Sequence, residues 1–524
     1  MNRRDFIKPV TTIRFCLLTA LLAIGTILLS PALTAQPASG TVNAVEPFEA
    51  GEISGIFYRN RQDASAWADD ELFEQLLQAL ASLSDHGLDP AHYHLQQLEK
   101  WRNDRQAREH YATDAWFAAA GHMLNGKLDP VTINPDWTAR GREADLVGSL
   151  EQALEQRTVT DSFEQFAPQQ PEYRMLQREL LSLRQQQSTP VHEVPAGPLL
   201  RRAMRSERVD DLQQRLIQLE LLSPDFQPGL MDDATVEAVR VFQAMHNLDT
   251  DGVVGTVTLT ALNRGLEEKL NQLRVNLERW RWLPDDLGRR HVRVNIAGFS
   301  VTTFEDGEPV RTHLAIVGKT YRKTPVFSDQ IEYLIFNPWW EVPASIAKVD
   351  KLPLFRSEPE LVRELGFHVL DSSGQDLDPD GIDWNRVTPG NFAYRIRQEP
   401  GINNALGQVK IMFPNVHNVY LHDTPTQGLF QQQQRAFSSG CVRTQYPLEL
   451  AAWLLEETPG WDLDRIHTVV ESGKETRVNL TNRVPVHVLY FTVVAQEHGG
   501  VRYLDDLYDR DKTVLSGLQK NFSQ

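Results

Sequence analysis

Residues 291–317, HVRVNIAGFSVTTFEDGEPVRTHLAIV, alternate apolar and polar side chains in three short runs. Alternation with a period of two is typical of strands that bury one face, so we expect strands over 291–296, 300–304 and 313–317. Asp306-Gly307 lies between the last two runs and supplies residues that tight hairpin turns prefer. This stretch therefore predicts that a β-rich domain begins at about residue 288.

The alternation lapses between Pro343 and Pro414, where Asp, Gly, Pro and Asn are frequent. Such a length is too great for a simple connection and is typical of lids or binding loops. Strands are expected again over 416–421 and 486–492. We therefore predict a mainly β domain over 288–472, with an inserted capping or lid region at 343–414. A C-terminal strand and tail, 473–524, should pack on this domain or on a helical one.

The chain before the β domain is predicted to form two helical units. Leucines at helical spacing between 72 and 83, and an Ala-rich apolar run over 111–124, predict helices of a domain that covers 45–195. A stretch rich in Gln, Ser and Pro follows and has the composition of a linker. Three short amphipathic segments then predict a small three-helix domain over 207–265. The fold class is multidomain α+β.

The first 35 residues differ in composition from the rest of the chain. Four basic residues precede an apolar run over 15–29, and small residues over 31–35 offer a cleavage site. This is the pattern of a signal peptide, so we expect an exported, periplasmic protein. Residues 3–8 also resemble a twin-arginine signal, which leaves the export route open. An uncleaved membrane anchor is disfavoured because the run is shorter than the roughly 20 residues that a spanning helix needs.

Composition narrows the class of protein further. The chain has 524 residues, 41% of them hydrophobic and 23% charged, which is ordinary globular usage. This length predicts about three domains. The formal net charge of −17 disfavours a nucleic-acid partner, because phosphates require a basic surface.

Cysteine usage points to one residue. The sequence has two cysteines, Cys16 within the apolar run of the signal and Cys441, so cleavage would leave a single thiol and no internal disulfide. A lone thiol in an oxidising compartment is exposed to oxidation and mispairing. It is either a small buried side chain or a reactive group.

The residues around Cys441 favour the reactive group. His422, at the end of a predicted strand, precedes Cys441 by 19 residues, and Gly440 and Arg443 flank the cysteine. A thiol with a pKa of about 8.5 needs a base or a positive charge to become a thiolate, and His422 and Arg443 supply these. The alternative role of Arg443 is to brace the loop by bonding to backbone carbonyls. Gly440 permits a tight turn that would direct main-chain N–H groups toward a tetrahedral oxyanion. The arrangement predicts an acyl-transfer site.

A histidine followed at this distance by Ser-x-Gly-Cys-Val-Arg resembles the L,D-transpeptidases of bacterial cell walls. The wider resemblance is to a large periplasmic subgroup that joins a helical scaffold domain, a peptidoglycan-binding module and a cysteine catalytic domain. The resemblance covers nearly all of the chain after the signal, and the three-helix region at 207–265 resembles the peptidoglycan-binding module. Further supporting stretches lie at 323–325, 337–343, 422–425 and 505–508.

The resemblance implies a mechanism. The Cys441 thiolate attacks the carbonyl between the third residue of a stem tetrapeptide, diaminopimelate in the expected substrate, and its terminal D-Ala. His422 protonates the departing D-Ala, and the side-chain amine of a second stem resolves the thioester to a 3-3 cross-link. The expected partners are then the donor and acceptor stems. Whether other cell-wall synthesis proteins are also partners is left open. The resemblance also implies acylation by carbapenems, no metal or organic cofactor, and a monomer.

Four other positions carry expectations of their own. Many family members have His or Asn where this chain has Ser439, so no second catalytic histidine is assigned there, although the hydroxyl could donate to the oxyanion. The backbone carbonyl of Asp423 is expected to orient His422, in preference to the Asp423 carboxylate. Trp340 and Tyr420 are candidates for lining the substrate cleft, and the alternative is that both belong to the core.

Two rival functions remain open at this stage. Water or a lipoprotein lysine could resolve the same acyl-enzyme, which would make an L,D-carboxypeptidase, an endopeptidase or a lipoprotein-anchoring enzyme. The other rival is a non-catalytic, peptidoglycan-binding scaffold, against which the intact pair of His422 and Cys441 argues.

Overall fold

The computed structural model describes residues 50–186, 190–223, 225–246, 248–496 and 499–520. The predicted signal peptide, 1–35, lies outside these residues. Among the helices of the described ranges, none is both long and apolar enough to cross a membrane.

The N-terminal domain is helical, as predicted, and is built around one long helix. Its main helices are α1 (Ala50–Asn60), α2 (Asp70–Ser82), α3 (Leu95–Lys100), α4 (Arg105–Asn125), α6 (Leu146–Gln156) and α7 (Pro171–Arg184). Small side chains of α4 alternate with Trp116 and Phe117, which are fully buried, so neighbouring helices approach it closely. The carboxylates of Asp69 and Asp104 cap the first turns of α2 and α4.

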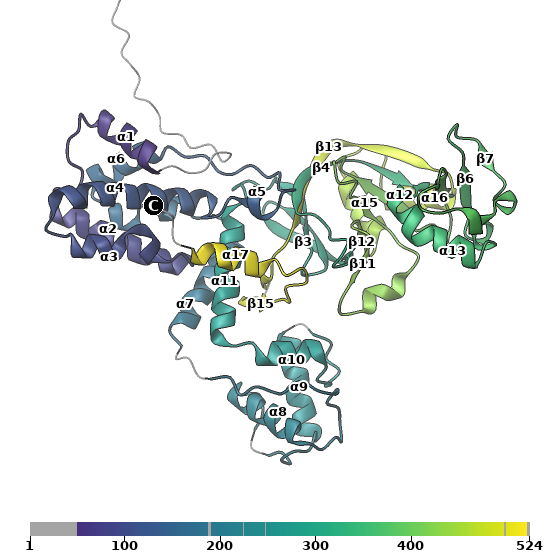
Figure 1. The fold of residues 1–524 in the computed structure, drawn as a ribbon, viewed down its shortest axis with the longest axis horizontal. Coiled ribbons are helices and arrows are strands. Elements are labelled where there is room, and N and C mark those ends of the chain that lie inside the picture. The colour runs from purple at the N-terminus through teal and green to yellow at the C-terminus, as the bar shows by residue number, and fades with distance from the viewer. Residues whose placement is uncertain (1–49, 187–189, 224, 247, 497–498, 521–524) are drawn as a thin grey trace, which may run out of the picture. The chain divides into compact units, whose positions relative to one another are not determined.

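The small domain has the three predicted helices, α8 (Glu207–Gln218), α9 (Asp233–Met245) and α10 (Thr256–Asn263), which lie together in Figure 1. It has its own hydrophobic core. Two buried amides fix its loops, because the Gln213 side chain donates to the Gln227 and Leu230 carbonyls and the Gln243 side chain donates to Val253. These bonds satisfy backbone carbonyls of the loops that connect the helices.

Helix α11 (Leu266–Arg281) continues from the small domain and packs on α7, α4 and the C-terminal helix α17 (Asp511–Gln519). No sequence prediction covered it. Glu278 and Arg281 form an ion pair whose side chains are completely buried. Glu278 also accepts from the Leu128 N–H at 2.8 Å, and Arg281 donates to the His86 carbonyl at 2.9 Å. The pair therefore ties the linking helix into the helical domain.

The C-terminal domain is organised by a nine-stranded sheet in the order β11-β3-β12-β10-β9-β4-β13-β1-β2. Its strands are β1 (Arg290–Asn295), β2 (Ser300–Glu305), β3 (Glu308–Gly318), β4 (Phe327–Phe336), β9 (Val409–Met412), β10 (Leu421–His422), β11 (Ala436–Ser438), β12 (Val442–Thr444) and β13 (Thr476–Leu489). An additional pairing of β3 with β2 closes the sheet on itself. Helices α15 (Pro447–Leu455) and α16 (Leu463–Glu471) contribute to the same core.

Most of the predicted strands are confirmed, and two differ. The strand expected over 416–421 is wrong before residue 421. The side-chain oxygen of Asn415 accepts the N–H groups of His417 and Val419, and Asn418 has φ +53°, so this stretch forms a compact loop. The strand expected over 486–492 begins earlier, because residues 476–479 already pair with β4, and it ends at Leu489.

The predicted insertion forms a capping subdomain with its own sheet and core (Figure 1). This sheet has the order β5 (Trp340–Glu341), β8 (Arg395–Gln398), β6 (Phe367–Leu370) and β7 (Asp376–Leu377). The bounds 343–414 need correction at both ends. The β5 strand precedes them, whereas β9 lies within them but pairs with β4 and β10 in the main sheet.

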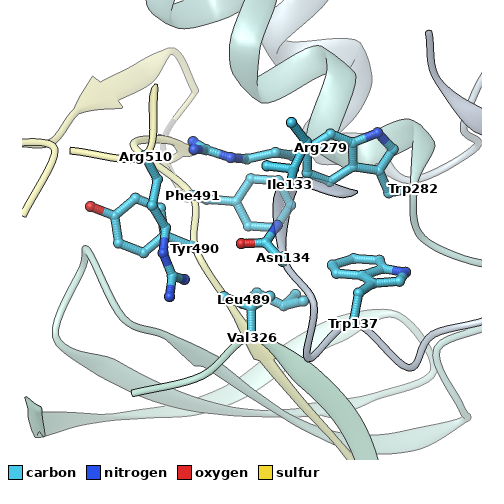
Figure 2. Close-up of a pocket in the computed structure, with 10 residues that line it drawn as sticks. All are labelled: Ile133, Asn134, Trp137, Arg279, Trp282, Val326, Leu489, Tyr490, Phe491 and Arg510. Carbon is cyan, nitrogen blue, oxygen red and sulfur yellow. The ribbon is translucent and has the colours of Figure 1, made fainter. Parts of the chain in front are cut away.

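Figure 2 shows a cavity where the helical domain, α11 and the end of β13 meet. Arg279 and Arg510 both face the Tyr490 ring, with their guanidinium carbons 5.2 and 5.0 Å from its centroid. No residue that lines this cavity belongs to the Cys441 loop. The cavity is therefore a feature of the domain junction.

The buried ion pair generates the first prediction. Arg281→Met should lower the free energy of unfolding by about 3–5 kcal/mol, because it leaves the Glu278 carboxylate buried and unpaired. Urea unfolding followed by tryptophan fluorescence measures this, since the indole N–H of Trp282 donates to Glu278. The control is Arg240→Met, which removes a surface pair with Glu237 at the same spacing and should change stability by less than about 0.5 kcal/mol. Equal effects of the two variants would contradict the prediction.

Candidate active site

The Cys441 loop is a tight turn between β11 and β12. Gly440 has φ +123°, a conformation that favours glycine. Ser438 fixes the turn from within, because its hydroxyl accepts the Gly440 N–H at 3.1 Å and donates to the Cys441 carbonyl at 2.5 Å. Among the described residues, the Cys441 N–H has no recorded acceptor, so it is available to an oxyanion.

A second loop, residues 318–324, supports the Cys441 loop. The Thr324 hydroxyl donates to the Gly440 carbonyl at 2.9 Å, and the Lys319 N–H donates to the Ser438 carbonyl at 3.0 Å. The Tyr508 hydroxyl donates to the Gly318 carbonyl at 2.5 Å. A side chain at Gly318 would collide with the Arg322 carbonyl. Two of the sequence stretches that carry the family resemblance, 323–325 and 505–508, thus meet beneath the cysteine loop.

His422 is placed beside this loop by strand pairing. The parallel pairing of β10 with β12 sets Leu421 opposite Val442 and His422 opposite Arg443. The His422 ring is 4% exposed, and its Nδ1 lies 2.5 Å from the Asp423 carbonyl oxygen. A proton on Nδ1 satisfies that carbonyl and leaves Nε2 as the basic nitrogen. The Asp423 carboxylate is engaged elsewhere, since it accepts from the Gln408 N–H and the Gln427 amide.

Burial sets the charge state of the pair. It lowers the pKa of His422 to about 3, with the Arg443 charge acting in the same direction. Burial also raises the pKa of the Cys441 thiol, against hydrogen bonds from Tyr420 and the charges of Lys410 and Arg443. Both shifts favour the uncharged forms, so the resting site holds a neutral thiol and a neutral imidazole.

Tyr420 is the side chain that joins Cys441 to the capping subdomain. Its ring lies 5.6 Å from the His422 ring, and both Tyr420 and Cys441 pack in the core of the capping subdomain with Trp340. Burial keeps the pKa of Tyr420 well above its usual value, so its hydroxyl remains a donor toward the thiol. Trp340 and Tyr420 are both buried, which limits the surface that they offer to a substrate.

Arg443 and Lys410 bring positive charge to the site. Arg443 donates to the Thr426 hydroxyl at 3.3 Å, and no ion pair of Arg443 is recorded within the described ranges. Lys410 stands opposite His422 on β9, with its Nζ 3.9 Å from the centroid of the Tyr420 ring. Lys410 was not among the site residues predicted from the sequence. The one sequence feature that could have indicated a role for Lys410 is its position within the apolar run 409–413. Val409, Ile411 and Phe413 of this run are fully buried.

Ser439 lies exposed at the tip of the loop. Its hydroxyl oxygen accepts from the Arg322 guanidinium at 2.8 Å, which leaves the hydroxyl proton free to donate.

In the part of the chain that the structure describes, no cluster of three or more His, Cys, Asp or Glu residues could hold a metal ion. The thiol, the imidazole and the nearby cations form an arrangement that is chemically suited to nucleophilic acyl transfer.

Three segments of the chain match protein-family models. Residues 55–180 match the scaffold domain, and residues 289–470 match the L,D-transpeptidase catalytic domain. Residues 205–262 match a family described provisionally as a peptidoglycan binding domain. These matches confirm the predicted family resemblance and fold class.

Some individual proteins are also similar to this chain. A curated Haemophilus influenzae protein, named provisionally as an L,D-transpeptidase, is 35% identical over 243 residues, which are 46% of this chain and 48% of that protein. The chain thus spans about half the length of this relative. Among solved structures, it is similar to an L,D-transpeptidase from Stackebrandtia nassauensis (13% identity, 58% of this chain, 97% of that chain, TM-score 0.20). One from Mycobacterium smegmatis is also similar (15% identity, 38% of this chain, 58% of that chain, TM-score 0.17).

The neutral pair predicts how Cys441 reacts with a thiol reagent. Because burial raises the thiol pKa, the thiolate fraction is small at neutral pH and grows as the pH rises. The rate of iodoacetamide labelling, followed by mass spectrometry, should therefore increase steadily from neutral to alkaline pH. A rate that has already levelled off at neutral pH would instead indicate a preformed thiolate–imidazolium pair.

Lys410 should alter that pH profile. Its charge stabilises the thiolate, so Lys410→Met should move the profile to higher pH and slow labelling severalfold at a fixed pH on its rising part. Lys512→Met, which removes an exposed lysine on α17, is the matched control and should leave the profile unchanged. Superimposable profiles for all three proteins would show that Lys410 does not act on the thiol.

Proposed function

We propose that this protein is an exported enzyme that cross-links peptidoglycan stems through a thioester on Cys441, and the match of residues 289–470 to the L,D-transpeptidase catalytic domain supports this. The observation that carries the proposal is the buried imidazole of His422, whose Nδ1 lies 2.5 Å from the Asp423 carbonyl oxygen, on the strand that pairs with the end of the cysteine loop. The substrates proposed are stem tetrapeptides, as donor and as acceptor.

The first half-reaction forms the thioester. As the Cys441 sulfur attacks the carbonyl between the third residue and D-Ala, Nε2 of His422 takes the thiol proton. The Cys441 N–H and the Ser439 hydroxyl are the groups proposed to face the oxyanion. Collapse of the intermediate breaks the C–N bond, and the imidazolium gives its proton to the departing amine of D-Ala. Because burial lowers the pKa of His422 to about 3, this imidazolium is a strong acid and transfers the proton readily.

The second half-reaction resolves the thioester. The side-chain amine of an acceptor stem attacks the thioester carbonyl, and His422 accepts the proton that the amine loses. The thiolate that leaves is stabilised by Arg443 and Lys410 until it recovers the proton from His422. The product is a 3-3 cross-link between diaminopimelate residues, and the enzyme returns to its neutral pair.

The other domains fit the same role. We propose that the small domain binds peptidoglycan and that the protein works in the periplasm as a monomer, after export by its N-terminal segment. The capping subdomain, whose core includes Tyr420 and contacts Cys441, is proposed to act as a lid over the cleft. Hydrolysis, or transfer to a lipoprotein lysine, is the alternative fate of the same thioester.

Incubation of the purified protein with disaccharide-tetrapeptide tests the proposal. Mass spectrometry should detect cross-linked dimers and free D-Ala, and both should be lost in Cys441→Ala. His422→Ala should lower the turnover rate by at least about 100-fold, since proton transfer by a positioned side chain contributes about that much.

The other outcomes separate the alternatives. Tripeptide and D-Ala without dimers would show that water is the acceptor. An unchanged substrate, together with no adduct of a carbapenem on Cys441, would favour the non-catalytic scaffold.

A further inference from the structure

Arg322 joins the Cys441 loop to the capping subdomain. Its Nη1 lies 2.8 Å from the Ser439 hydroxyl oxygen and 2.6 Å from a carboxylate oxygen of Asp350. Asp350 belongs to η5 (Ala347–Lys351), a π-helical turn of the capping subdomain. The guanidinium therefore contacts Ser439, which lies two residues before the nucleophile, and a carboxylate from the capping subdomain is bound to the same guanidinium.

The loop that carries Arg322 is firmly held and locally basic. Its hydrogen bonds to Ser438, Gly440 and Tyr508 fix its backbone, so the position of Arg322 is defined. The Tyr321 ring is 72% exposed and has cations close to it, with Lys319 Nζ at 5.7 Å and the Arg322 guanidinium carbon at 6.0 Å. In a chain with net charge −17, this loop is a local surface on which an anion is favoured.

The bond between Arg322 and Asp350 is suited to exchange. The Arg322 side chain is 21% exposed and that of Asp350 is 41% exposed, and ion pairs of such exposure contribute little net stability. A guanidinium binds any carboxylate in the same geometry, through a planar set of donors. A carboxylate that enters the cleft can therefore take the place of Asp350 without loss of a hydrogen bond.

We propose that the Arg322 guanidinium forms a receptor for the terminal carboxylate of the donor stem, and that Asp350 occupies this receptor in the free protein. The inference rests on the proposed function for its substrate. The terminal carboxylate is chosen because it lies on the residue that leaves, attached to the α-carbon that carries the scissile amide nitrogen. Binding of the stem would release Asp350 and with it one tie between the capping subdomain and the cysteine loop.

Binding measurements test the receptor without requiring turnover. Each variant is made in the Cys441→Ala background, and calorimetry gives its Kd for disaccharide-tetrapeptide and for the same compound with a C-terminal amide. Arg322→Gln should weaken binding of the acid by about tenfold, whereas Asp350→Asn should strengthen it severalfold by removing the competitor. Neither variant should change the Kd of the amide.

A second ion pair of the capping subdomain serves as the control. Arg363→Gln and Asp378→Asn break a partly exposed pair of the same chemistry and should leave both Kd values unchanged. Shifts in the same direction for Arg322→Gln and Asp350→Asn would mean that the pair is only a structural brace. Equal Kd values for acid and amide in the parent protein, or no binding of either, would also overturn the receptor.

Failure of the proposed function has a different signature. In that case the protein with Cys441 intact releases no D-Ala, although the acid and the amide still differ in Kd. The melting temperature of each variant is measured alongside, so that a loss of binding through unfolding is recognised.

Discussion

The parallel pairing of β10 with β12 is the constraint on which the candidate site depends. These strands are short, and Leu421 and His422 face Val442 and Arg443 across them. The pairing fixes three things at once: the histidine, the cation opposite it and the end of the cysteine loop. It is itself held by β9 on one side and β3 on the other, so the closed sheet acts as a rigid frame for the chemistry.

The same frame explains why both His422 and Cys441 are uncharged in the resting site. Burial opposes both a thiolate and an imidazolium. The Asp423 carbonyl orients the His422 ring and favours its positive charge less than a carboxylate would. Arg443 and Lys410 act in the other direction on the sulfur. The site therefore stores no separated charges at rest and stabilises a thiolate mainly when the proton has moved to His422 during the reaction.

The sequence predicted those features that depend on local pattern. The three-helix domain, the strands after residue 290 and the pair of His422 and Cys441 follow from periodicity and from one motif. Features that depend on tertiary contacts could not be predicted from the sequence. Asn415 turns an expected strand into a loop through its own side chain, and Lys410 becomes part of the site only because β9 pairs with β10. The end of the insertion was misplaced for the same reason, since nothing local in 409–412 distinguishes a strand of the main sheet from one of the capping sheet.

The departure of Ser439 from the family pattern gains a physical meaning from Arg322. A serine hydroxyl both accepts and donates, so one small group can bind the guanidinium at 2.8 Å and still offer its proton to an oxyanion. A histidine or asparagine at this position would place a larger side chain between Arg322 and the loop. The serine thus allows the basic loop 318–324, which already supports the cysteine turn from below, to reach its exposed side as well. Support of the nucleophile and recognition of an anion are in this way assigned to one loop.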